Sequence, residues 1–202
     1  MKTQTICTLF ISIFLVSCAN PINLKTAQNY AQGCVGFQHQ GEWWKARQAC
    51  GRGAINAELG GGEPQAIAAL WYEYGRTSGV ICDYPEAKKA LEKSLDADKA
   101  YNGPVIIDYF ELARLQFDQK LFKEASAFYQ SGIAATPKEI IDQDPIGYAE
   151  VLDEYGETLK QIGNAAESER VITESKQLRL SNPNKNSLTK RTPYGKFCDQ
   201  KS

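Results

Sequence analysis

Apolar residues recur every three to four positions along most of the chain between residues 25 and 179, and no strand-like alternation of comparable length competes with this pattern. Such spacing places apolar side chains on one face of an α-helix. The pattern predicts an all-α fold, with helices at 25–39, 43–58, 65–79, 84–97, 104–118, 121–135, 146–161 and 164–179. The connectors are rich in helix-breaking residues, at 60–64, 101–104 and 142–145.

The predicted helices form pairs that repeat one order of side chains. In each pair, a small residue on the first helix is followed 12 positions later by a small residue on the second helix. The four pairs are Cys34 and Ala46, Gly75 and Ala87, Ala113 and Ala125, and Gly156 and Ser168. Two small residues that face each other let two helix backbones cross closely, so we expect four stacked helix pairs.

This order resembles the tetratricopeptide repeat over residues 27–182, and the long steps between units also resemble the related Sel1-like repeats. The resemblance implies a right-handed alpha-solenoid of about four helix pairs whose first helices line a concave groove. By the phase of the repeat, the groove would carry Gln28, Gln38, Tyr72, Arg76, Phe110, Arg114, Phe117, Asp153 and Glu157. Aromatic residues beside arginines are typical of protein-binding hot spots. The alternative is that Phe110 and Phe117 pack under a neighbouring unit. Some relatives hold a terminal carboxylate between two arginines, a role that Arg76 and Arg114 would take here.

The first residues have the outline of a signal peptide, with Lys2 followed by an apolar run of 11 residues, from Ile6 to Val16. This run is about half the ~20 residues that a membrane-spanning helix needs. The tetrad that ends at Cys18, Leu-Val-Ser-Cys, resembles the lipobox of bacterial lipoproteins. That resemblance implies a signal peptide at 1–17, lipid on Cys18 and a linker at 18–26. In that family an aspartate after the lipidated cysteine favours the inner membrane. The residue here is Ala19, which implies the periplasmic face of the outer membrane.

An even number of cysteines then remains, and an exported protein is expected to pair them. They are Cys34, Cys50, Cys82 and Cys198. By the repeat geometry, Cys34 and Cys50 lie on facing helices of the first unit, so we expect a disulfide between them; two buried free thiols are the alternative. Cys82 would then pair with Cys198 by elimination. Cys198 lies in a basic tail, residues 183–202. Five basic residues against one aspartate give residues 185–202 a net charge of +4, which favours a solvated extension.

Charge and motifs exclude several functions. With 23 basic and 24 acidic residues, the chain has no excess charge that would attract nucleic acid. A single histidine, His39, and the absence of known catalytic or phosphate-binding motifs give no catalytic residues, metal or cofactor. We therefore expect no enzyme but a membrane-anchored adaptor that binds a peptide or helix of a protein partner. Lipoproteins of the resembled class act in the assembly of envelope machines. The alternatives are a disulfide-rich Sel1-like enzyme acting on cell-wall fragments, and a structural spacer. The sequence indicates no oligomeric state.

Overall fold

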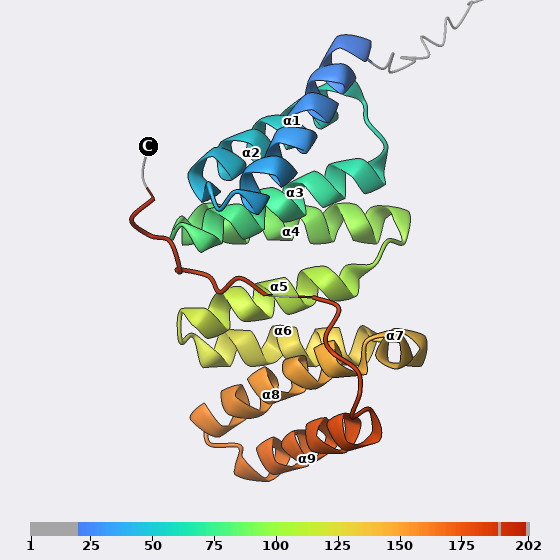
Figure 1. The fold of residues 1–202 in the computed structure, drawn as a ribbon, viewed down its shortest axis with the longest axis vertical. Helices are drawn as coiled ribbons and strands as arrows, with labels where there is room; N and C mark the ends of the chain where they lie inside the picture. Colours follow the sequence, from blue (N-terminus) through green and yellow to red (C-terminus); the bar gives the residue numbers. More distant parts are fainter. Residues whose placement is uncertain (1–19, 190, 201–202) are drawn as a thin grey trace, which may run out of the picture.

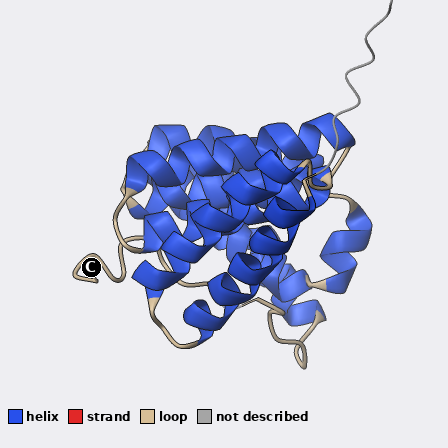
Figure 2. Ribbon diagram, turned by 90° about the horizontal axis from the view of Figure 1, so that it is seen from above, coloured by secondary structure: helices blue, strands red, loops and turns tan. Residues whose placement is uncertain are grey.

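The computed structural model describes residues 20–189 and 191–200, so the predicted signal peptide and Cys18 lie outside the described residues. This part of the chain is a stack of helices with no strand (Figures 1 and 2). Its helices are α1 (Pro21–His39), α2 (Trp43–Gly60), α3 (Pro64–Val80), α4 (Tyr84–Tyr101), α5 (Val105–Asp118), α6 (Phe122–Ala135), α7 (Lys138–Gln143), α8 (Pro145–Gln161) and α9 (Ala165–Ser181). None of the described helices is long and apolar enough to cross a membrane.

All eight predicted helices are present, with two differences. Helix α1 begins at Pro21, so residues 21–26 of the predicted linker are helical. Asn20 caps this helix, because its side chain accepts hydrogen bonds from the backbone amides of Ile22 and Asn23. Between α6 and α8 the structure has a further short helix, α7, which starts directly after Pro137 and overlaps the start of the predicted connector at 142–145. A single apolar pair, Ile140 and Ile141, is too short a signal for helical periodicity.

The small residues lie where the two helices of each unit cross, as the repeat pattern predicts. The four helix pairs are α1–α2, α3–α4, α5–α6 and α8–α9. A Cβ added to Gly75 would lie 2.7 Å from Leu91 Cγ, and one added to Gly156 would lie 2.6 Å from Ile172 Cδ1. Ala87 and Ala125 on the opposing helices are fully buried. No larger side chain fits between these backbones.

A second backbone contact recurs in two of the units. The Ser94 hydroxyl on α4 donates to the carbonyl of Ala68 on α3 at 3.0 Å. The Ser175 hydroxyl on α9 makes the same bond to the carbonyl of Ala149 on α8, also at 3.0 Å. Both serines lie 19 residues after the small residue of their first helix, so the two pairs pack in the same register.

The first helix pair is joined by a disulfide between Cys34 and Cys50, whose Cα atoms are 4.9 Å apart. Both residues are buried, at 1% and 0% exposure. The expectation of a pair is therefore confirmed over that of two free thiols. The bond closes a short loop inside a terminal unit that packs against only one neighbour.

The prediction that the C-terminal tail is a solvated extension is wrong for residues 191–200. This stretch, which we call the C-terminal segment, crosses the stack from α8 towards α3 (Figure 1). Tyr194 is 6% exposed and belongs to the main apolar cluster, with Phe197 packed against it. Cys198 is paired with Cys82, with 5.1 Å between the Cα atoms. The prediction failed because it rested on the net positive charge of the tail, whereas two aromatic residues of the tail bury apolar area against the stack.

Candidate functional site

A row of hydrogen-bonded and ion-paired polar side chains crosses the face of the stack formed by α1, α3, α5 and α8, which we call the first-helix face. We call this row the charge ladder. In order along the stack, it consists of Gln38, Glu73, Arg76, Glu111, Arg114 and Glu154. Gln38 Nε2 donates to Glu73 Oε2 at 2.9 Å, and Arg76 Nη1 lies 3.8 Å from the same oxygen. The ladder joins each first helix to the next one along the stack.

Glu111 is the central carboxylate of the ladder. Arg76 Nε lies 3.6 Å from its Oε2, and Arg114 donates from Nη1 to its Oε1 at 3.1 Å. The Tyr194 hydroxyl donates to Oε2 at 2.6 Å. Burial alone would raise the pKa of Glu111, but Arg114 and Arg76 outweigh it and hold this pKa below its usual range. Glu111 is therefore an ionised, fully bonded carboxylate rather than a free acid or base.

The ladder ends at Glu154, where the C-terminal segment joins it. Glu154 Oε2 accepts from Arg114 Nε at 2.9 Å and from the Tyr129 hydroxyl at 3.0 Å. Arg191 Nη1 lies 3.4 Å from Glu154 Oε1, and Arg191 also forms an ion pair with Asp118 at the end of α5. The segment thus adds a third arginine to the buried charges.

After Arg191, two aromatic side chains and two backbone hydrogen bonds hold the C-terminal segment against α2 and α3. The ring of Tyr194 lies on Gly79, where an added Cβ would be 2.2 Å from Tyr194 Cδ1. Phe197 stacks on Trp43, with 5.8 Å between ring centroids. The amides of Gly195 and Phe197 donate to the carbonyls of Gly79 and Val80 at 2.9 and 3.0 Å. These carbonyls belong to the last turn of α3, where helix carbonyls lack a partner within the helix, and that of Gly79 also accepts from the amide of Cys82 in the following turn at 3.1 Å.

The rest of the first-helix face holds an open pocket of about 520 Å³ between α5, α7 and α8. The start of the tail closes one side of it through Thr189 and Arg191. Arginines and a buried tyrosine contribute polar groups, and branched and aromatic side chains form the walls. The lining residues are Tyr72, Arg76, Pro104, Ile106, Ile107, Phe110, Glu111, Arg114, Thr136, Ile140, Asp144, Gly147, Tyr148, Val151, Thr189 and Arg191. Ile107 and Ile140 remain 46% and 41% exposed. Apolar walls with a few polar groups are the usual lining of a binding site.

The structure brings part of the sequence-predicted groove together at this pocket. Tyr72, Arg76, Phe110 and Arg114 line it. Phe110 also covers Gly132 of its own unit and packs against an apolar cluster that includes residues of α8, so it both lines the pocket and packs against the neighbouring unit. Phe117 does not line the pocket. Its ring packs against Phe122 and Tyr129 on α6, the second helix of its own unit.

The remaining predicted residues do not line the pocket. Gln38 reaches the ladder through Glu73, whereas Gln28 is exposed elsewhere on α1. Asp153 accepts from the hydroxyl of Ser175 at 2.6 Å and pairs with Arg179 on α9. Glu157 accepts from Gln161 on its own helix. Arg76 and Arg114 each bond to the first helix of the next unit. Among the described residues no further helix pair follows the fourth unit, so its acidic residues have no such partner there.

The sequence reasoning missed the ladder's three glutamates, although they leave a signal. Glu73, Glu111 and Glu154 each stand two positions before the small residue of a first helix. Three glutamates at one repeat position, each facing an arginine, indicate ion pairs between units. The two arginines assigned to a clamp for a terminal carboxylate already hold the carboxylates of the ladder.

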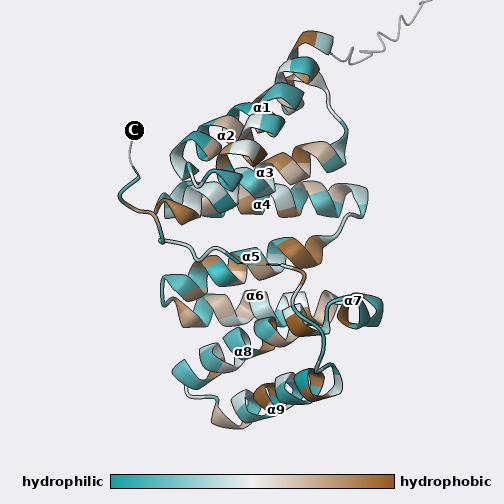
Figure 3. Ribbon diagram, in the orientation of Figure 1, coloured by the Kyte–Doolittle hydropathy of each residue, from teal (hydrophilic) through white to brown (hydrophobic). Residues whose placement is uncertain are grey.

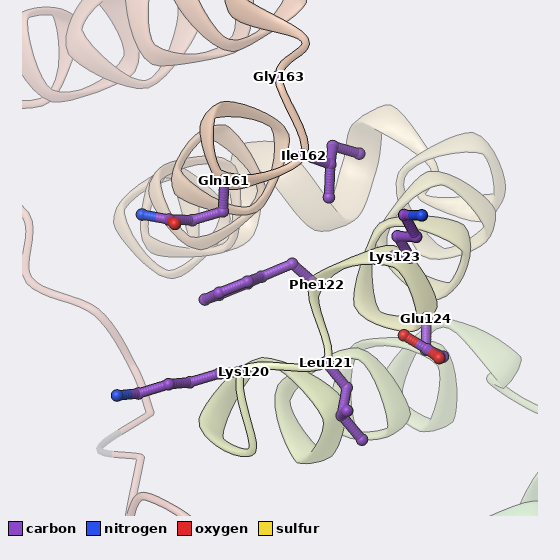
Figure 4. A pocket seen from close by; sticks show the side chains of 8 residues that line it. All are labelled: Lys120, Leu121, Phe122, Lys123, Glu124, Gln161, Ile162 and Gly163. Atoms are coloured by element: carbon purple, nitrogen blue, oxygen red, sulfur yellow. The ribbon is translucent and has the colours of Figure 1, made fainter.

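Other hollows and acidic groups differ from this site. A wide, shallow hollow lies between the turn after α5 and the turn after α8, where side chains such as Lys120 and Gln161 extend outward rather than converge (Figure 4). The residues described contain no cluster of histidine, cysteine and acidic side chains that could hold a metal ion. A pair of carboxyl groups, Asp98 and Asp108, is buried between α4 and α5, outside the pocket.

Asp108 makes stability depend on pH. Burial and hydrogen bonding to Asp98 raise the pKa of Asp108 from 3.8 to about 8. Between about pH 4 and pH 8 the folded chain therefore holds a proton that the unfolded chain has lost, so the free energy of unfolding falls as the pH rises. We expect a loss of roughly 2 kcal/mol between pH 6 and pH 8, since one pKa unit corresponds to about 1.4 kcal/mol.

Urea unfolding at a series of pH values measures this effect. Asp108→Asn keeps a neutral side chain at all pH values and should remove the slope. Asp96→Asn, on the exposed face of α4, should leave the slope unchanged. An unaltered slope in Asp108→Asn would rule out this carboxyl as its source.

Comparisons with known proteins bear on the fold. No protein-family model matches the chain, and a search of curated proteins finds no match. The crystal structure of BtubC (BKLC) from P. vanneervenii superimposes with a TM-score of 0.72 at 14% identity, over 82% of this chain and 68% of that one. A putative kinesin light chain from Podosopora anserina with nearly identical TPR-like repeats gives 0.62 at 14% identity, over 79% of this chain and 77% of that one. The chain has an all-α, TPR-like solenoid fold.

Proposed function

We propose that this chain is a protein-binding scaffold, anchored to a membrane by lipid on Cys18, that takes an apolar side chain of a partner polypeptide into the open pocket. The observation that carries the proposal is the pocket itself. It remains open on the first-helix face, and two exposed isoleucines, Ile107 and Ile140, stand among its lining residues. Apolar side chains in a concave site are where binding energy concentrates in protein interfaces.

The C-terminal segment defines what kind of partner fits. Because residues 191–200 cover the ends of α3 and α5, a long extended peptide has no continuous path along the first-helix face. A partner is therefore expected to insert a short segment with one or two large apolar side chains between α5, α7 and α8. The arginines beside the pocket are already paired, so they orient polar backbone groups of the partner rather than neutralise a strong acid.

Crosslinking from inside the pocket tests this proposal. A photoreactive phenylalanine analogue is placed at Ile107 in the full chain, in its native membranes. We expect a discrete crosslinked species, whose partner is then identified by mass spectrometry. The matched control places the analogue at Leu59, which is 66% exposed on α2 and does not line the pocket.

A second substitution decides whether the adduct reflects recognition. Ile140→Lys puts a charge into the pocket without disturbing the core, since Ile140 is exposed on α7. It should weaken binding of the identified partner segment to the purified chain by about tenfold or more, which corresponds to about 1.4 kcal/mol. Equal adducts at Ile107 and Leu59, or binding insensitive to Ile140→Lys, would refute the pocket as the recognition site.

The anchor and its location are a separate part of the proposal. The lipobox-like tetrad that ends at Cys18 and the alanine after it support a lipoprotein on the periplasmic face of the outer membrane. Two or more acyl chains on one residue hold a protein at a membrane stably. Metabolic labelling with a radioactive fatty acid should mark the natural chain and not Cys18→Ser, and fractionation should place the label in the outer membrane. A labelled Cys18→Ser chain would contradict this assignment.

A further inference from the structure

The C-terminal segment binds the first-helix face in the manner of a peptide ligand. Residues 191–193 have no regular structure and residues 194–199 form turns against the end of α3, where the amides of Gly195 and Phe197 are bonded to helix carbonyls. Among its side chains, Tyr194 is buried as an anchor whereas Lys196 is exposed. Main-chain hydrogen bonds combined with sites for particular side chains are how many protein surfaces bind peptides.

Each anchor of the segment has a matching site on the repeats. Arg191 meets the carboxylates of Asp118 and Glu154. The ring of Tyr194 fits the space over Gly79, and its hydroxyl donates to Glu111. The ring of Phe197 stacks on Trp43. The surface thus selects a cation, an aromatic residue three positions later, a glycine next, and a second aromatic two positions further.

The connection between α9 and this segment is long enough to let it move. Residues 183–186 are exposed, and the described part of this connection contacts the repeats mainly through hydrogen bonds from Lys185 and Leu188. The segment is otherwise tied to the stack covalently, by the disulfide from Cys198 to Cys82 in the turn after α3. That disulfide is only half-buried, whereas the Cys34–Cys50 pair is fully buried. A reductant therefore reaches the Cys82–Cys198 bond first.

We propose that the C-terminal segment is a built-in occupant of a second docking surface, and that reduction of the Cys82–Cys198 disulfide releases it so that a partner peptide of the same pattern binds in its place. A dithiol protein or small dithiol supplies the two electrons. One of its thiolates attacks a sulfur of the disulfide and forms a mixed disulfide, and its second thiolate then displaces the protein sulfur. Cys82 and Cys198 end as two thiols, and the dithiol ends as a disulfide.

This surface adjoins the open pocket and shares Glu111 and Arg191 with it. Its other contacts, at Gly79, Trp43 and Asp118, do not line the pocket. Departure of Arg191 would also remove one wall of the pocket. The two proposals are tested separately, because the pocket is probed in the oxidised chain with the segment in place and the second surface is probed after reduction with the segment's own peptide. Failure of the pocket to capture a partner would leave this proposal standing, and the reverse also holds.

A nicked chain tests the proposal with the protein otherwise intact. A specific protease site is inserted between Asn184 and Lys185, in the exposed connection, and the folded, oxidised chain is cut there. The cut tail stays attached through the disulfide. Dithiothreitol is then added, and release of the tail is followed by gel filtration with mass spectrometry. A fluorescent peptide of residues 191–200 carrying Cys198→Ser reports rebinding by anisotropy.

We expect no peptide binding before reduction, and tail release followed by saturable binding after it. A peptide with Tyr194→Ala should bind about tenfold more weakly or worse, because it loses a buried ring and a hydrogen bond to Glu111. The matched control peptide, Lys196→Ala, changes an exposed side chain and should bind within about twofold of the original.

Three results would overturn the proposal. The first is a reduced chain that has released its tail, keeps its helical circular dichroism and does not bind the peptide. The second is loss of the helical signal on release, which would make the segment a structural strap. The third is a tail that stays bound for hours after reduction and excludes the peptide, which would mean that the disulfide does not control access.

Discussion

Replacing Glu111 with glutamine should lower the free energy of unfolding by about 3–5 kcal/mol, the largest effect that we expect of a single substitution in this chain. The carboxylate is 9% exposed and compensates two arginines that are themselves mostly buried, Arg76 and Arg114, at 20% and 13% exposure. Glutamine keeps the shape of the side chain but removes its charge. Both guanidinium groups then lose part of their compensation in a site that water scarcely reaches.

Urea unfolding of the purified chain at neutral pH measures this loss. The matched control is Glu92→Gln on α4, which also removes a carboxylate from an ion pair, with Lys88. Both side chains of that pair are about half exposed, and surface pairs contribute less than about 1 kcal/mol. If Glu111→Gln cost no more than Glu92→Gln, the ladder would not be a buried network. Acidification below about pH 4.5, the ordinary pKa of a glutamate, should act in the same direction, because the pKa of Glu111 is lowered by folding and its contribution is lost as the pH falls through that range.

The second large effect is expected from removal of the Cys82–Cys198 disulfide. This bond joins residues 116 apart in the sequence, so it restricts much of the unfolded chain. The chain-entropy model gives about 5 kcal/mol for a loop of this length, against about 3 kcal/mol for the 16-residue loop of Cys34–Cys50. For a domain of this size, 5 kcal/mol corresponds to a fall of roughly 10–20 °C in the midpoint of thermal unfolding.

Scanning calorimetry of two double variants makes the comparison. Cys82→Ala with Cys198→Ala should unfold at a lower temperature than the natural chain and retain its helical circular dichroism at 25 °C. Cys34→Ala with Cys50→Ala is the matched control for the shorter loop. An unchanged midpoint in the first variant would mean that the long loop is not closed by this bond in solution.

The sequence contains most of the information for the helix pairs. The 12-residue spacing from Gly75 to Ala87 and from Gly156 to Ser168 is local, and it reflects a backbone crossing that permits no larger side chain. The Cys34–Cys50 pair follows from the same register. These features were predictable because they depend on neighbouring residues and helical periodicity.

The position of the C-terminal segment on the stack could not be predicted from local sequence. It depends on contacts with residues far away in the sequence, such as Glu111 and Gly79, and the segment's basic charge resembles that of a solvated tail. Tyr194 and Phe197 were visible, but two aromatic residues without periodicity do not indicate which surface they cover. The predicted disulfide did indicate where the segment lies, because a bond to Cys82 brings this segment back to the end of α3.

The pocket was predicted in part for a related reason. Repeat phase placed Tyr72, Arg76, Phe110 and Arg114 on the first-helix face, and these four line the pocket because each lies on a first helix with a following unit. It extended the same rule to the fourth unit, which no further helix pair follows among the described residues, and Asp153 bonds to its own second helix instead. Walls from α7 and the tail, at Ile140 and Arg191, lie outside the repeat altogether.

Hydrogen exchange of the C-terminal segment tests most directly the central claim that the chain closes part of its own first-helix face. The amides of Tyr194, Gly195 and Phe197 donate to Asp118, to Gly79 and to Val80, so they should exchange at least about 100-fold more slowly than in an unstructured peptide. Exposed residues 184–186 provide the comparison within the same chain and should exchange faster. Exchange of all these amides at the unprotected rate in the oxidised protein would contradict the account.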